Sequence, residues 1–232
     1  GVFDSGIRWS HNDLCDRNRD QFSESRVKGG WNYIDDVNIE SDKDNDDSEV
    51  SHGTKVAGII GAVRNNNKGI AGIAGIAGGN DDSEPGVSLY AMKVGRPLPD
   101  GRDLIENVLA TAAIVDGALF NPSRDVGMGL HIANHSWSGP GSNSVFNAIN
   151  TAYRHSMTTI VSVGNDGIPA PAFPGRYSDT KDHYVIAAAA TGDDGNFVVA
   201  GVNNGGSNYT SNWGPAVDIV APGIRDLVFT ID

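Results

Sequence analysis

Short apolar runs alternate with segments of helical periodicity along the chain, and this alternation constrains the fold more than any other feature. Most runs are apolar at every position, as strands are when helices cover both faces of a parallel sheet. We expect strands at 1–3, 87–94, 131–134, 158–163, 184–189 and 217–220. The pattern predicts an α/β fold with a doubly wound, mostly parallel sheet flanked by helices.

Three segments between these strands have the spacing of amphipathic helices. Apolar side chains recur three and four positions apart in 53–63, 103–115 and 144–155. Asp103 is the expected N-cap of the second segment. The acidic stretch 35–49 and the Gly- and Asp-rich stretch 75–86 are expected to be loops, because the strand–helix alternation resumes after each.

Length and charge narrow the class of protein. A chain of 232 residues fits one domain spanning residues 1–232. The net charge of −12 argues against nucleic acid and anionic membranes as partners. No apolar run is long enough to span a membrane, and no signal peptide is present. Cys15 is the single cysteine, so no disulfide can close within the chain.

Two motifs near the beginning of the chain offer a carboxylate and an imidazole. Asp4 opens an Asp-Ser-Gly turn at the end of the first expected strand, the edge where parallel sheets build their sites. His52 opens the helix His-Gly-Thr-Lys-Val-Ala-Gly, whose amino-terminal partial charge favours the neutral ring that a general base needs. Taken singly, an ordinary turn and a helix-capping histidine are the better explanations of the two motifs.

Three further motifs follow later expected strands. Asn-His-Ser-Trp-Ser-Gly-Pro spans 134–140, and Val-Gly-Asn-Asp-Gly spans 163–167. The amide of Asn165 can donate a hydrogen bond to a developing oxyanion, although an asparagine there also suits a left-handed turn. Ser-Asn-Trp-Gly at 211–214 precedes Val-Asp-Ile-Val-Ala-Pro-Gly at 217–223.

In this order, the five motifs resemble those of subtilisin-like serine peptidases, the subtilases, over residues 2–223. The resemblance implies a subtilisin-like fold and a serine endopeptidase that hydrolyses polypeptides with a Ser-His-Asp triad. By motif, Asp4 and His52 correspond to the triad aspartate and histidine, and Asn165 to the oxyanion-hole asparagine. A secreted or extracytoplasmic location is implied by the family alone.

The resemblance also assigns substrate-binding residues. Ser136, Trp137, Ser138 and Gly139 correspond to the segment that pairs with substrate backbone and walls the primary pocket. Asp166 follows the oxyanion asparagine and is expected at the rim of that pocket. A carboxylate there favours Lys or Arg at the cleaved position, by about 1 kcal/mol or less because it is partly solvated.

The chain departs from the family pattern in several places. The serine block Gly-Thr-Ser-x-Ala of the family follows Ala-Pro-Gly, but this chain ends at Asp232 without it. We therefore expect a partial catalytic domain, truncated at both ends and inactive as it stands. Lys55 replaces the usual second histidine, and Ser138 replaces a common glycine, which narrows the expected pocket.

The family resemblance further implies structural calcium and a cis peptide bond at Phe173-Pro174. Calcium prefers several oxygen ligands. The loop with Asn65 and Asn67 follows the family pattern loosely, and the acidic run is a second candidate from composition alone, through Asp42, Asp44 and Asp46.

Three alternatives compete with the peptidase interpretation. A pseudopeptidase that binds without cleaving would have little reason to retain Asp4, His52 and Asn165. A calcium-binding module is suggested by the acidic loop, although such loops often only face water. A nucleotide-binding protein using residues 69–79 lacks both a G-x-G-x-x-G turn and a P-loop lysine.

The peptidase interpretation makes one geometric prediction. Asp4 and His52 are 48 residues apart, yet a carboxylate oxygen of Asp4 should lie roughly 2.6–3.2 Å from Nδ1 of His52. Asn165 should border the same cleft. Side chains of Asp4 and His52 on opposite edges of the sheet would contradict the assignment.

Overall fold

The structure is a computed structural model of the 232-residue chain. It describes residues 1–15, 20–42, 46, 51–76, 86–100, 102–119, 129–180, 182–192, 194–199, 202, 209–223 and 230. The chain forms two compact units, Gly1–Met128 with Thr230–Asp232, and Gly129–Phe229. We call them unit 1 and unit 2 and describe each by itself.

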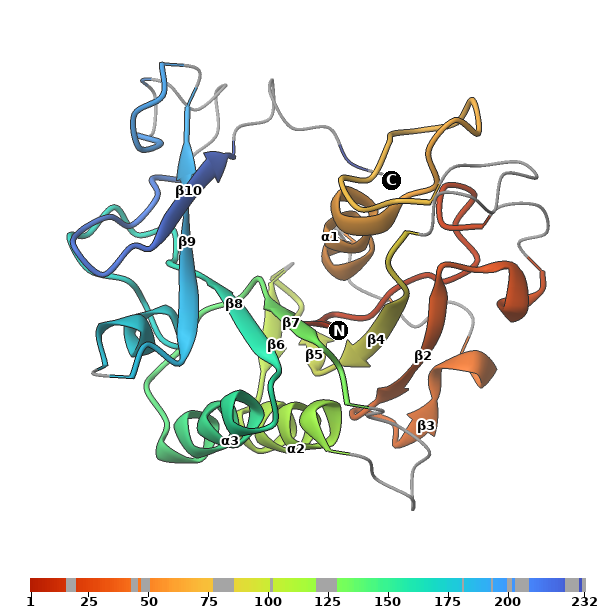
Figure 1. Ribbon diagram of the computed structural model, residues 1–232, viewed down its shortest axis with the longest axis horizontal. Helices are drawn as coiled ribbons and strands as arrows, with labels where there is room; N and C mark the ends of the chain where they lie inside the picture. Colours follow the sequence, from red (N-terminus) through yellow and green to blue (C-terminus); the bar gives the residue numbers. More distant parts are fainter. Residues whose placement is uncertain are drawn as a thin grey trace. The chain divides into compact units, whose positions relative to one another are not determined.

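Unit 1 is built on a sheet in the order β1-β4-β2-β3 (Figure 1). Strand β1 (Val2–Asp4) pairs in parallel with β4 (Leu89–Lys93), and β4 pairs in parallel with β2 (Val27–Asn32). The short β3 (Val37–Asn38) closes the edge in an antiparallel direction. The parallel pairs place Asp4 at the carboxyl end of β1, opposite Lys93.

Strand β2 was not predicted, because Lys28, Gly29 and Gly30 interrupt its apolar pattern. The glycines have a packing reason. A Cβ at Gly30 would lie 1.9 Å from the backbone oxygen of Ala91 in β4, and the backbone φ of 139° at Gly30 also favours glycine. The strand therefore forms through close backbone approach rather than through side-chain hydrophobicity.

Two helices and a hairpin complete unit 1, together with the 3-10 turns Phe22–Glu24 and Ile39–Ser41. Helix α1 spans His52–Gly61, and α2 spans Asn107–Ala118. The expected helix start at Asp103 is wrong. Asp103–Ile105 forms strand β6, which pairs antiparallel with β5 (Gly95–Pro97) across the Pro-Asp turn. The residues of the turn favour a hairpin here, although the spacing of the apolar residues favoured a helix.

The interior of unit 1 gathers apolar side chains from its strands, from α1 and from the loop after β1. Leu14 and Ile7 are fully buried beside residues of β1, β2 and β4. Trp9 joins this core and meets the ring of Phe22 edge-on at 5.2 Å between centroids. The core thus fixes β1 and the loop that follows it.

Unit 2 contains four parallel strands in the order β10-β9-β8-β7, seen from blue to green in Figure 1. They are β7 (Ile132–His135), β8 (Thr158–Ser162), β9 (Val185–Thr191) and β10 (Ile219–Pro222). Helix α3 (Asn143–Arg154) packs on β8, and a 3-10 turn, η3 (Gly175–Asp179), contacts β9. These parallel strands and helices confirm the predicted α/β class.

Most expected elements coincide with observed ones within a few residues. The strands expected at 1–3, 87–94, 131–134, 158–163 and 184–189 are β1, β4, β7, β8 and β9. The strand expected at 217–220 lies two residues later, as β10. The bond between Phe173 and Pro174 is cis, as expected. Among the helices that the structure describes, none has the length and apolar character needed to cross a membrane.

Candidate active site

The candidate active site in unit 1 begins where β1 ends and α1 starts. Asp4 is the last residue of β1 and is 3% exposed, while His52 is the first residue of α1. The two elements can approach because residue 53 is glycine. A Cβ at Gly53 would lie 2.1 Å from the backbone oxygen of Gly6 and 3.1 Å from Cβ of Asp4.

Asp4 and His52 are in direct contact. Nδ1 of His52 lies 2.7 Å from Oδ1 of Asp4, which confirms the predicted distance. The same carboxylate oxygen accepts a hydrogen bond from the backbone N–H of Ser5 at 2.8 Å. The side chain of His52 is 44% exposed and that of Asp4 is 4% exposed, so a buried carboxylate orients a partly accessible imidazole.

The hydrogen bond to Asp4 raises the pKa of His52 above its ordinary value, against the lowering effect of partial burial. The negative charges of Asp4, Asp103 and Asp46 add to the increase. An imidazole whose Nδ1 is bound to a carboxylate has its tautomer fixed, which leaves Nε2 to exchange a proton with a reacting group.

A second element of the predicted site is the turn after β8 in unit 2. Asn165 and Asp166 are both exposed there, between Gly164 and Gly167, which have positive φ angles of 95° and 67°. The expected amide is therefore presented on a glycine-flanked turn. A bridge between Asp166 and Thr210 holds the far side of this turn.

Asn212 organises the same turn from within, although sequence reasoning gave it no role. Its side chain is fully buried, and its Oδ1 accepts hydrogen bonds from the backbone N–H groups of Asp166 at 2.8 Å and Ile168 at 3.2 Å. Its Nδ2 donates to the backbone oxygen of Val163 at 2.9 Å. The Ser-Asn-Trp-Gly motif was the available signal, but the contact partners lie over 40 residues away in sequence.

The segment 136–139 directly follows β7 in unit 2. The backbone N–H of Gly139 donates to Phe173 at 2.9 Å, and the backbone oxygen of Trp137 accepts from Ser162 at 3.2 Å. Ser138 and Gly139 are exposed, while Ser136 and Trp137 are partly buried. The segment is thus anchored on one side and accessible at its end.

Asn65 and Asn67, two of the residues expected as calcium ligands, lie in the loop that follows α1. Asn65 and Asn67 are exposed, with φ angles of 60° and 58°. Their loop closes on Asp13, whose two carboxylate oxygens accept from Asn66 at 2.9 Å and from the backbone N–H of Ile70 at 2.7 Å. Asp13 therefore holds this loop through two hydrogen bonds.

The acidic run, the second candidate for a calcium site, is described only in part. Asp42 accepts a hydrogen bond from Asn32 at 2.9 Å, Asp46 binds groups at the start of α1, and Asp44 lies outside the described residues. Over the described part of the chain, no group of three or more His, Cys, Asp or Glu residues could hold a metal ion.

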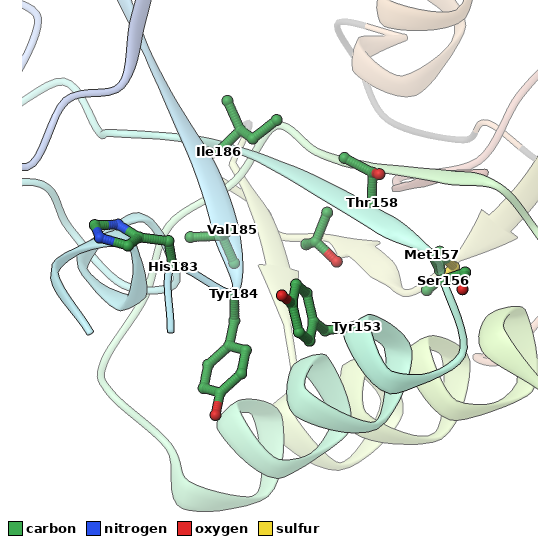
Figure 2. A pocket seen from close by; sticks show the side chains of 9 residues that line it. Tyr153, Ser156, Met157, Thr158, His183, Tyr184, Val185 and Ile186 are labelled. Carbon is green, nitrogen blue, oxygen red and sulfur yellow. The ribbon is translucent and has the colours of Figure 1, made fainter. Parts of the chain in front are cut away.

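A pocket of about 440 Å³ lies elsewhere in unit 2, at the amino ends of β8 and β9 (Figure 2). Tyr153 from α3 and Tyr184 before β9 meet edge-on there, with ring centroids 5.3 Å apart. Asn165 and Asp166 follow the carboxyl end of β8, so this pocket and the predicted oxyanion turn lie at opposite ends of the same strand.

Comparison with known proteins places this geometry in a family. The sequence profile of the subtilase family matches residues 1–229. The chain belongs to the subtilase family. Thermitase of Thermoactinomyces vulgaris is 27% identical over 223 residues, which cover 96% of this chain and 61% of that protein. Alkaline elastase YaB of Bacillus sp. (strain YaB) is 30% identical over 224 residues, or 96% of this chain and 44% of that protein.

Solved structures support the same fold for this subtilase. A protease from Pseudoalteromonas arctica has a TM-score of 0.61 at 25% identity, over 96% of this chain and 61% of that chain. A cold-adapted subtilisin-like serine proteinase has a TM-score of 0.56 at 20% identity, over the same shares of the two chains. The chain spans about three fifths of the length of the first of these relatives.

Proposed function

We propose that this chain supplies the aspartate and the histidine of a Ser-His-Asp triad in a serine endopeptidase. The observation that carries the proposal is the 2.7 Å contact between Nδ1 of His52 and Oδ1 of the buried Asp4. Two residues 48 positions apart meet in the orientation that a general base and its orienting carboxylate require. Family membership supports the same reaction class.

The proposed reaction is acyl transfer to the serine of the triad. The serine oxygen attacks the peptide carbonyl carbon while its proton passes to Nε2 of His52. His52 then gives that proton to the leaving amine as the peptide C–N bond breaks, which leaves the acyl group on the serine. Water attacks this ester in the same way, with His52 as the base, and releases the carboxylic acid and the free serine. Asp4 holds the tautomer and stabilises the imidazolium, and the side chain of Asn165 donates to the oxyanion.

Substrate binding is assigned to unit 2. We propose that the segment from Ser136 to Gly139 pairs with substrate backbone and that Asp166 acts at the rim of the primary pocket. Asp166 is exposed, which limits its effect on a cationic side chain to about 1 kcal/mol or less. The test measures kcat/KM on substrates with Lys and with Phe at the cleaved position, for the parent and for Asp166→Asn. If the Lys-to-Phe ratio of kcat/KM is the same in both proteins, Asp166 does not act on the primary pocket.

The test of the proposed function uses the full-length protein. We expect it to hydrolyse casein and chromogenic peptides and to be labelled by a fluorophosphonate at the triad serine. A full-length protein that binds such peptides but neither cleaves them nor reacts with the probe is the pseudopeptidase alternative. We further propose an extracytoplasmic location, which fractionation of the source cells can check.

Calcium stays a prediction without a supporting ligand set. We propose Asn65 and Asn67 as the residues to examine, since both are exposed and their side-chain amide oxygens are of the kind that calcium binds. The melting temperature of the full-length protein should fall when a chelator is added. An unchanged melting temperature would contradict the proposed calcium binding and also the alternative that the chain is a calcium-binding module.

A further inference from the structure

Asp46 is a buried carboxylate that the proposed reaction does not use. It is 2% exposed, and both of its oxygens accept hydrogen bonds. Oδ1 accepts from the hydroxyl of Ser5 at 2.7 Å, and Oδ2 accepts from the backbone N–H of Thr54 at 2.8 Å and from the hydroxyl of Thr54. A buried carboxylate that accepts three hydrogen bonds is part of the folded structure and is not merely a charge facing water.

The partners of Asp46 are the neighbours of the proposed catalytic pair. Ser5 directly follows Asp4, and Thr54 lies two residues after His52. The hydroxyl of Ser5 also accepts a hydrogen bond from the backbone N–H of Gly53 at 2.9 Å. Asp46 and Ser5 together therefore tie the end of β1 to the first turn of α1.

This arrangement replaces the usual cap of the helix. Ser51 occupies the N-cap position, but its backbone is left-handed, with φ 46° and ψ 48°, and its side chain makes no cap hydrogen bond. The N–H groups of Gly53 and Thr54 are satisfied instead by Ser5 and Asp46. A negative charge at this end of α1 also complements the helix dipole.

We propose that Asp46 is a positioning residue: through Ser5 and Thr54 it fixes the start of α1 against the end of β1, so that His52 meets Asp4 in reactive geometry. The inference rests on the proposed function. Asp46 contacts the chain segments that carry Asp4 and His52, at Ser5 and at Thr54. Small displacements of such pairs are costly, about 10²-fold in rate for a shift near 1 Å.

Asp46 also acts on the charge of His52 at a distance. The carboxylates whose charges raise the pKa of His52 are Asp4 from β1, Asp103 from β6 and Asp46 itself. Removing the charge at position 46 therefore lowers the pKa of His52. Since the general base works as the neutral ring, the acid limb of the kcat/KM profile should move to lower pH, while the plateau value falls from lost positioning.

The experiment compares Asp46→Asn with Asp116→Asn in the full-length protein. Asp116 is a matched control, because it is also buried in unit 1 and accepts a hydrogen bond, from Tyr33 at 3.1 Å. We expect kcat of Asp46→Asn to fall by about tenfold or more, with KM nearly unchanged and the pKa of His52 lowered in an NMR titration. Asp116→Asn should change neither kcat nor that pKa.

Two further variants keep the proposal testable if Asp46→Asn does not fold. Thr54→Val removes the hydroxyl that binds Asp46, and Thr54→Ser keeps it. Thr54→Val should lose activity and Thr54→Ser should retain it. Equal activity in both variants, or an unchanged kcat and His52 pKa in folded Asp46→Asn, overturns the proposal.

The NMR titration separates this inference from the proposed function. If the parent protein hydrolyses no peptide, the proposed function fails, yet the pKa of His52 in Asp46→Asn still reports whether Asp46 acts on that ring. If the parent is active and Asp46→Asn matches it in both measurements, the inference alone fails.

Discussion

Helices α1 and α3 both begin after a serine, but different kinds of residue bind the backbone N–H groups of their first turns. In α3, the hydroxyl of Ser142 accepts a hydrogen bond from the backbone N–H of Val145, three residues further on, at 3.5 Å. In α1, Ser51 makes no such bond, and the first N–H groups bind Ser5 and Asp46. One helix end is stabilised locally and the other by residues from elsewhere in the chain.

The difference follows from what each end has to do. A local cap stabilises a helix wherever it lies, and the end of α3 carries no proposed chemistry. A cap supplied by the turn after β1 also fixes the position of α1 relative to β1, which places His52 against Asp4. The long-range cap is therefore a positional constraint as well as a source of stability.

The largest expected effect concerns the reactive side chain at the start of α1. His52→Ala in the full-length protein should lower kcat/KM by about 10⁴-fold or more, as expected for the loss of a triad histidine. His155→Ala is the control, because His155 is an exposed histidine at the C-terminal end of α3. Comparable losses in both variants, measured on a peptide substrate, would contradict the triad assignment.

The next effect tests the long-range cap. Ser5→Ala leaves the N–H of Gly53 and one oxygen of Asp46 without their partner, so the free energy of unfolding should fall by about 2 kcal/mol. Urea titration measures it. Ser23→Ala, at an exposed serine, should change that free energy by less than about 0.5 kcal/mol. Equal stabilities of the two variants would show that the observed network contributes nothing.

The local cap should contribute less. Ser142→Ala removes the hydroxyl that caps α3, and the expected cost is about 1 kcal/mol of unfolding free energy. Ser51→Ala, at the same position of α1, should cost almost nothing because no cap bond is lost. Urea unfolding of both variants decides the matter, and a larger loss for Ser51→Ala would reverse the comparison.

The smallest effect has the opposite sign. Ser51 has a left-handed backbone, which costs a non-glycine residue about 1–2 kcal/mol. Ser51→Gly relieves that strain but adds chain entropy to the unfolded state, so we expect a net gain of about 0.5 kcal/mol. Thermal unfolding of the variant beside its parent gives the sign, and destabilisation by Ser51→Gly would show that the hydroxyl of Ser51 makes an important contact.

Most of the fold could be predicted from local pattern, and the failures have identifiable causes. Strand β9 is an apolar run, and α3 has a clear apolar stripe, so each was expected close to its observed bounds. Strand β2 was missed because its glycines serve close backbone approach. The helix expected from Asp103 began at Asn107 instead, because a hairpin turn precedes it.

The sequence by itself determined which residues carry the proposed chemistry. Asp4, His52 and Asn165 stand in short motifs whose order identifies the family, and motif order needs no coordinates. Turn and helix-start chemistry also indicated that Asp4 ends a strand and that His52 lies at the beginning of a helix.

Only the tertiary structure decided which residues support those motifs. Asp46 read as one more charge in an acidic loop, and Asn212 as part of a turn motif, yet both are buried. Asp46 binds the hydroxyl of Ser5, and Asn212 binds the backbone N–H of Asp166, each more than 40 residues away in sequence. A hydrogen bond between residues far apart along the chain leaves no periodicity for sequence reasoning to find. It exists only once strand pairing and helix packing have brought its donor and acceptor together, and in this protein those contacts hold the proposed site in place.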